Sequence, residues 1–85
     1  MTRIKAAEIL ENITSKGLFS VIVFYRSPIT NTVEERHMYA DANSEVWAIA
    51  DSWKKNYTDL GFDFLIYVNK NIEYSNNYHA FEFDE

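Results

Sequence analysis

The sequence predicts an α+β fold, a two-layer sandwich in which two helices lie on one face of a four-stranded antiparallel sheet. Three observations predict it. Two segments with helical periodicity each end at a glycine, two strand-like segments are apolar on both faces, and a length of 85 residues suits one domain. We therefore expect a single small domain over residues 1–85, with its elements in the order α-β-β-α-β-β.

The stretch from Asp41 to Phe62 is predicted to be the amphipathic helix around which the chain is organised. At about 100° per residue its apolar side chains fall on one stripe, which consists of Ala42, Val46, Ile49, Ala50, Trp53, Tyr57 and Leu60. Gly61 can adopt the left-handed conformation, so that Phe62 folds back onto Tyr57 in a Schellman motif. Three side chains near the start offer an oxygen that can cap the first turn: Asp41, Asn43 and Ser44.

A shorter helix is predicted before Gly17, where the same device places Leu18 in contact with Ile13. Thr2 is its candidate cap. The apolar stripe of this helix comprises Ala6, Ile9, Leu10 and Ile13. The 2 glycines of the chain are thus expected to end its two helices.

The segments Leu18–Arg26 and Phe62–Asn69 are expected to be central strands. Both are rich in β-branched and aromatic residues and are apolar on both faces. Val33–Ala40 carries charges on both faces, which is typical of an exposed edge strand. Pro28 fixes the backbone of the turn between the first two strands.

The C-terminal part is expected to form a hairpin whose turn lies at Asn76-Asn77, because asparagine tolerates the positive φ of tight turns. This turn pairs Ile72–Ser75 with Tyr78–Phe83. A turn at Asn69–Asn71 is the alternative, and it shifts the register of the last strand.

A right-handed crossover returns the third strand beside the first, on the side away from the second, which predicts the strand order 2-1-3-4. With both helices on one face, the apolar residues of the other face need a cover. We consider three covers: the C-terminal hairpin or loop, a second copy of the chain, and a foreign protein. We predict a homodimer through the sheet face or edge.

The charge balance argues against direct nucleic-acid binding. Asp and Glu number 13 against 8 Lys and Arg, the net charge is -5, and no basic cluster exists beyond Lys54 and Lys55. The chain contains no cysteine, and its longest apolar run, Val21 to Tyr25, is far too short to cross a bilayer. We therefore expect a soluble, cytoplasmic protein.

No constellation of residues predicts an enzyme, a metal site or a cofactor. His37 and His79 lack the spacing of a ligand pair, and no serine lies in the G-x-S-x-G setting of a nucleophile. The sheet aromatics Tyr25 and Tyr67 could stack on RNA bases, but the sequence string that marks an RNA-recognition sheet is missing.

The sequence favours a protein-binding function. Small size, acidity and the lack of cysteine are typical of accessory proteins of phages and mobile elements. We expect a stoichiometric inhibitor or antitoxin-like module that occupies a basic, nucleic-acid-binding host protein. The alternatives are a small structural homodimer and an RNA- or small-molecule-binding domain.

Trp47 is the candidate anchor of such an interface. It lies about 100° from the centre of the apolar stripe, beside Asp51 and Lys54 at the boundary between the buried and wet faces. Its indole either leans onto the edge of the core or contacts a partner. Asp51 is a candidate as its neighbour, and the remaining candidates are sheet aromatics and C-terminal acids: Tyr25, Tyr67, Glu82, Asp84 and Glu85.

Overall fold

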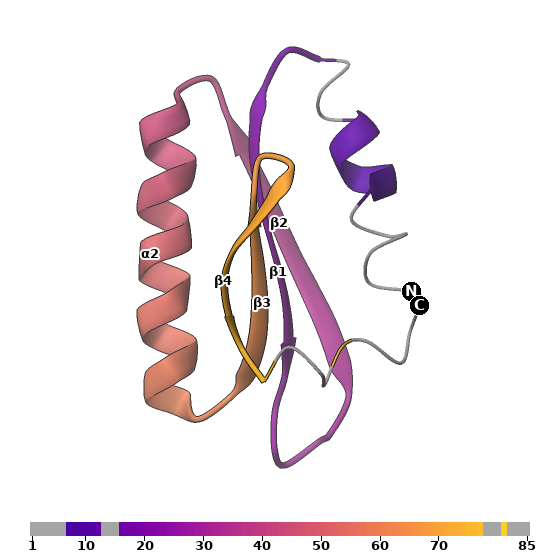
Figure 1. The fold of residues 1–85 in the computed structure, drawn as a ribbon, viewed down its shortest axis with the longest axis vertical. Coiled ribbons are helices and arrows are strands. Elements are labelled where there is room, and N and C mark those ends of the chain that lie inside the picture. The colour runs from indigo at the N-terminus through magenta and orange to yellow at the C-terminus, as the bar shows by residue number, and fades with distance from the viewer. Residues whose placement is uncertain (1–6, 13–15, 78–80, 82–85) are drawn as a thin grey trace.

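The computed structural model describes residues 7–12, 16–77 and 81 of the chain (Figure 1). Residues 7–12 are helical, and the remaining elements are β1 (Phe19–Arg26), β2 (Val33–Ala40), α2 (Asn43–Leu60), β3 (Asp63–Val68) and β4 (Asn71–Asn76). The strands form one sheet in the order β2-β1-β3-β4, and all neighbours are antiparallel. The predicted α+β class and strand order are confirmed.

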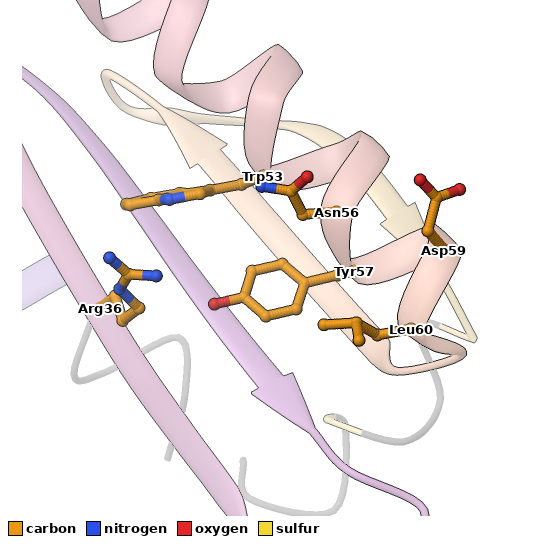
Figure 2. A pocket seen from close by; sticks show the side chains of 6 residues that line it. All are labelled: Arg36, Trp53, Asn56, Tyr57, Asp59 and Leu60. Carbon is orange, nitrogen blue, oxygen red and sulfur yellow. The ribbon is translucent and has the colours of Figure 1, made fainter.

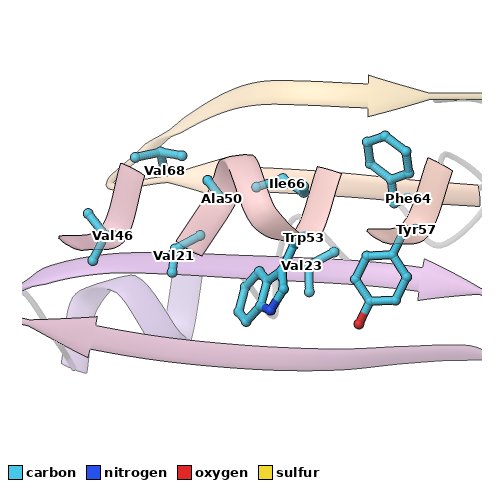
Figure 3. Close-up of a cluster of buried hydrophobic side chains, with 9 residues drawn as sticks. All are labelled: Val21, Val23, Val46, Ala50, Trp53, Tyr57, Phe64, Ile66 and Val68. Carbon is cyan, nitrogen blue, oxygen red and sulfur yellow. The ribbon is translucent and has the colours of Figure 1, made fainter. Parts of the chain in front are cut away.

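α2 covers one face of the sheet, because its apolar stripe meets alternate residues of β1 and β3 (Figure 3). The buried side chains of this core are Val21, Val23, Val46, Ala50, Trp53, Tyr57, Phe64, Ile66 and Val68. A fully buried aliphatic or aromatic side chain stabilises a fold by about 1.5–3 kcal/mol. The burial of this stripe therefore positions the helix on the sheet.

The C-terminal end of α2 is the predicted Schellman motif. Gly61 has a φ of 74° and donates its N–H to the carbonyl of Thr58, while the N–H of Phe62 donates to the carbonyl of Tyr57. The rings of Tyr57 and Phe62 lie 5.7 Å apart. The sequence therefore identified both the residue that ends the helix and the contact that follows it.

The N-terminal end of α2 differs from the prediction. The N-cap is Ala42, and no side chain caps the first turn with a hydrogen bond. Asn43, one of the predicted caps, instead accepts a hydrogen bond at its Oδ1 from Nδ2 of Asn69, 3.0 Å away. The side-chain cap was predicted wrongly, because the helix begins at Asn43 and the N-cap position falls on Ala42, which has no side-chain acceptor.

The opposite face of the sheet has its own core, and this corrects the prediction that both helices lie on one face. Leu10, from the helical residues 7–12, and Phe81 are buried there with four sheet residues, which are Ile22, Phe24, Leu65 and Tyr67. Figure 1 shows residues 7–12 on the side of the sheet opposite α2. The central strands are apolar on both faces, and segments from the two ends of the chain cover the second face.

The turn between β3 and β4 lies at Asn69 and Lys70, which confirms the alternative. Asn77 has a φ of 47°, but most of the strand predicted to follow the turn at Asn76-Asn77 lies outside the described residues, so that pairing stays a prediction. Asn69 has a φ of 58°. Its N–H donates to the carbonyl of Ser20 at 2.8 Å, and its Oδ1 accepts from the N–H of Ser20 at 3.2 Å. These contacts with β1 fix the turn at Asn69. Of the predicted last strand, Tyr78–Phe83, the structure describes Phe81 alone.

Gly17 has a φ of 71°, which agrees with the left-handed position predicted after the first helix. The predicted cap Thr2 and the stripe residues Ala6 and Ile13 lie outside the described residues. Leu10 lies within them and is buried, as the stripe requires.

Candidate partner-binding surface

A hollow lies on the α2 side of the sheet, between α2 and the edge strand β2 (Figure 2). It forms because α2 packs on β1 and β3 to the same extent and much less on β2. Its volume is about 400 Å³, and its lining consists of Arg36, Trp53, Asn56, Tyr57, Asp59 and Leu60. One wall of the hollow is thus helical, and β2 supplies the other.

Arg36 is the β2 residue that reaches across this hollow. The register places it opposite Val23, on the face of the sheet that α2 covers. Its guanidinium carbon lies 5.3 Å from the centre of the Trp53 ring, which is a cation–π distance. Figure 2 shows the side chain extending from β2 towards Trp53 and Tyr57. The contact joins the β2 wall of the hollow to its α2 wall.

Two large apolar side chains flank the hollow and are exposed. Leu60, in the last turn of α2, is 61% exposed, and Met38, which faces the same side as its β1 neighbour Val21, is 44% exposed. Both side chains would lose water contact if a partner lay along the hollow, and this gives the hollow a capacity for binding.

Tyr25 lies next to Tyr57, one of the residues that line the hollow. Its ring stacks on that of Tyr57 at 4.9 Å and also contacts Phe62. Burial raises the pKa of the Tyr25 phenol above its usual value, and the hydrogen bond with the Glu34 carboxylate raises this pKa further. The register places Glu34 opposite Tyr25, so this acid lies on the face of β2 that borders the hollow.

Trp47 lies on the other flank of α2, against β4. Its ring meets that of Tyr74 edge-on at 6.4 Å, and the Tyr74 hydroxyl donates to Oδ1 of Asp51 at 2.6 Å. Lys54 places its Nζ 4.5 Å from the centre of the same Tyr74 ring. The position of Trp47 at the edge of the stripe therefore has an internal reason, because it joins α2 to β4. Its indole remains half-buried.

The structure does not bring the predicted partner-binding residues together. Trp47 and Asp51 lie on the β4 flank of α2, and Tyr25 lies on the β2 flank. Tyr67 is buried on the opposite face of the sheet. The three acids predicted near the C-terminus lie outside the described residues: Glu82, Asp84 and Glu85.

Sequence reasoning missed the hollow and the residues that give it character, Arg36, Trp53 and Leu60. Trp53 and Leu60 were both assigned to the buried stripe, but Leu60 is exposed. The available signal was the assignment of Val33–Ala40 to an edge, since a helix that packs on the two central strands leaves an edge strand uncovered.

A second hollow lies on the other face of β2. It has a volume of about 240 Å³ and is lined by Glu8, Ile9, Asn12, Lys16, His37 and Tyr39. His37 and Tyr39 alternate with Arg36 and Met38 along β2, so they face the opposite side of the sheet. β2 is therefore flanked by a hollow on each face.

Comparison with known proteins returned no match to a family model, to a curated protein or to a solved structure. Among residues 7–12, 16–77 and 81, no group of three or more His, Asp or Glu side chains is placed to hold a metal ion. Within the same part of the chain, none of the helices has the length and apolar character needed to cross a membrane.

Proposed function

We propose that this chain is a small acidic protein-binding module, a stoichiometric inhibitor or antitoxin-like accessory protein that occupies a basic protein. The observation that carries the proposal is the hollow between α2 and β2, which combines exposed apolar side chains with acids. Protein-binding sites of this kind have an apolar centre and a polar rim. The net charge of -5 adds a long-range attraction for a basic partner.

The chemistry of the hollow supports a basic rather than an acidic partner. Its base, Arg36, is engaged over the Trp53 ring. The acids beside it are Asp59, which lines the hollow, and Glu34, which neighbours Arg36 on the same face of β2. A lysine or arginine of a partner thus meets carboxylates at the rim, while an apolar side chain next to it meets Leu60.

The test begins with affinity capture from the source cell, followed by measurement of the purified complex by calorimetry. We expect a basic protein, bound at one copy for each chain. Raising the salt concentration should slow association more than it speeds dissociation, because rim charges act mainly on the rate of encounter. A complex that is indifferent to salt removes the acids from the proposal.

Variants on the two flanks of α2 locate the interface. Leu60→Ala should weaken the complex by about tenfold in Kd, because Leu60 is the most exposed apolar residue that lines the hollow. Ile29→Ala is the matched control, since Ile29 is 91% exposed in the loop between β1 and β2 and does not line the hollow. If Trp47→Ala weakens binding and Leu60→Ala does not, the partner lies on the β4 flank and the hollow is not the site.

A further inference from the structure

The two edges of the sheet differ in their readiness to accept another strand. β2 has 8 residues and pairs with β1 in an unbroken register. β4 has 6 residues, and its pairing with β3 shifts between Ile66 and Tyr67. Irregular pairing is one of the devices by which proteins blunt a sheet edge. In addition, Trp47 and Lys54 of α2 contact the ring of Tyr74 on β4.

The charges along β2 are self-complementary. The strand carries Glu34 and Glu35 followed by Arg36 and His37. When two such strands pair antiparallel about a two-fold axis, the acids of one lie beside the bases of the other. In the register centred on Glu35, each Glu34 faces an Arg36 of the second copy on the side that α2 covers, and the two Glu35 side chains meet on the other side. In the register centred on Arg36, the two Arg36 side chains face each other with Glu34 of each copy as a diagonal neighbour, and each Glu35 faces a His37.

We infer that two copies of the chain pair antiparallel along β2, and that this pairing completes the partner-binding site. The result is one continuous sheet of eight strands across the two copies. A hollow lies between β2 and α2 on one face and between β2 and residues 7–12 on the other, which leaves room for the approach. Within the described part of the chain, β2 pairs with β1 alone, so its other side can supply the hydrogen bonds of strand addition.

The pairing places the two α2 helices on the same face of the combined sheet, because the two-fold axis is perpendicular to it. In each copy α2 lies above the midpoint between β1 and β3, which is about one and a half strand spacings from β2. The two-fold axis lies half a spacing beyond β2, so each helix is about two spacings from the axis. With ~4.8 Å between strands, the two helix axes are about 19 Å apart. Two helix packing distances of about 8–10 Å fill this gap. The trough between the helices is therefore as wide as one further α-helix.

The trough has the chemistry of a site for a basic amphipathic helix. The two β2 strands form its floor and the two α2 helices form its walls, and each copy supplies two acids and one base: the floor residues are Glu34, Arg36 and Met38, and the wall residues are Trp53, Asp59 and Leu60. This identification of the partner segment rests on the proposed function. The pairing along β2 does not, and the two are tested separately.

Sedimentation equilibrium tests the pairing with a pair of charge variants. We expect the wild-type chain to sediment at twice its mass of 10.0 kDa. Glu34→Lys and Arg36→Glu should each weaken self-association by about tenfold or more in Kd, since each gives positions 34 and 36, which share the face that α2 covers, the same sign of charge. An equimolar mixture of the two variants should regain the affinity of the wild type, because opposite charges then face each other.

Glu73→Lys is the matched control, because Glu73 is an exposed acid on the other edge strand, β4. It should leave self-association unchanged, and circular dichroism confirms that each variant is folded. A wild-type chain that stays at 10.0 kDa at high micromolar concentration overturns the pairing. A dimer whose Kd is unchanged by both β2 variants also overturns the pairing. So does a dimer whose Kd rises as much with Glu73→Lys as with the β2 variants.

A synthetic helix of lysine and leucine, as long as α2, tests the trough, with a glutamate and leucine helix as its control. The wild type should bind the basic helix and not the acidic one. Arg36→Glu should bind the basic helix about tenfold more weakly although it is more acidic, and mixing it with Glu34→Lys should restore binding. If monomeric Arg36→Glu binds the basic helix as tightly as the wild type does, the trough between two copies is not the binding site, and the proposed function stands. If the pairing holds but neither the basic helix nor a basic protein binds, the proposed function fails and the pairing along β2 stands.

Discussion

The two faces of the sheet are buried by different means, although β1 and β3 contribute the same kind of side chain to both. On one face a single helix of 18 residues supplies a continuous stripe that ends in a Schellman motif. On the other face Leu10 and Phe81, which are far apart in the sequence, meet over Ile22 and Phe24.

The comparison of the two faces shows which part of a small fold is specified by local sequence signals. The α2 face depends on one segment whose periodicity and end signals agree with each other. The opposite face depends on Leu10 and Phe81, which lie far apart in the sequence and are both buried against the central strands. We therefore expect substitutions on the two faces to differ in how they affect stability.

The largest expected effect concerns the second face. Phe81→Ala should destabilise the fold by about 3 kcal/mol, because Phe81 is 1% exposed and its loss leaves a cavity against Phe24 and Leu65. Urea unfolding followed by circular dichroism measures the change. Ile29→Ala, at a residue that is 91% exposed, is the control and should change stability by less than about 0.5 kcal/mol. A cost below about 1 kcal/mol for Phe81→Ala means that this face does not depend on the C-terminal segment.

The next largest effect is expected at the two glycines, Gly17 and Gly61. Gly17→Ala and Gly61→Ala should each cost about 1 kcal/mol or more, because both residues have a positive φ that a Cβ disfavours. The added Cβ meets nothing within 4 Å at either site, so the cost is conformational rather than steric contact with a neighbour. Thermal unfolding of both variants measures it. A variant as stable as the wild type shows that its glycine is not needed to end the helix.

The uncapped start of α2 offers a gain in stability. Ala42 has the extended backbone of an N-cap, with φ -109° and ψ 129°, but its side chain cannot accept a hydrogen bond. Ala42→Ser should stabilise the fold by about 0.5–1 kcal/mol, since a serine hydroxyl can accept from the free N–H groups of the first turn. Chemical unfolding of this variant beside Ala42→Gly separates the hydroxyl from the backbone effect. No gain over the wild type contradicts the assignment of the cap.

Two features with a local cause were predicted correctly from the sequence. The end of α2 at Gly61 and the bounds of β2 each follow from side chains within the segment itself. The side of the sheet on which Leu10 packs has no such cause, because a helical stripe shows which residues are buried and not which face they cover. The turn at Asn69 was decided by Ser20, which lies 49 residues away.

Contacts between segments far apart in the sequence also explain why the candidate site was predicted only in part. The position of Trp47 at the edge of the stripe was readable, but its contact with Tyr74 was not, because the register of β4 depends on the turn before it. Leu60 was assigned to the core by periodicity alone. Its exposure follows from the weak packing of α2 on β2, which only the assembled sheet determines.

The smallest expected effect concerns the contact that joins α2 to β4, and it depends on pH. The hydrogen bond to Asp51 raises the pKa of the Tyr74 phenol above its usual value. A raised folded-state pKa means that the stabilisation is complete below the unfolded value of about 10 and is lost as the pH rises through the folded-state pKa. Tyr74→Phe should therefore be less stable than the wild type near neutral pH, and the gap should close in alkali. Unfolding in urea at about pH 8 and about pH 11 measures this difference in stability.

Two controls assign the pH dependence to Tyr74. Tyr25, whose pKa is also raised, is present in both proteins, so its contribution cancels in the difference. In an Asp51→Asn background the gap should change less with pH, because the carboxylate that opposes ionisation is gone. A gap that is the same at both pH values in the wild-type background means that the Tyr74 hydroxyl does not hold α2 against β4.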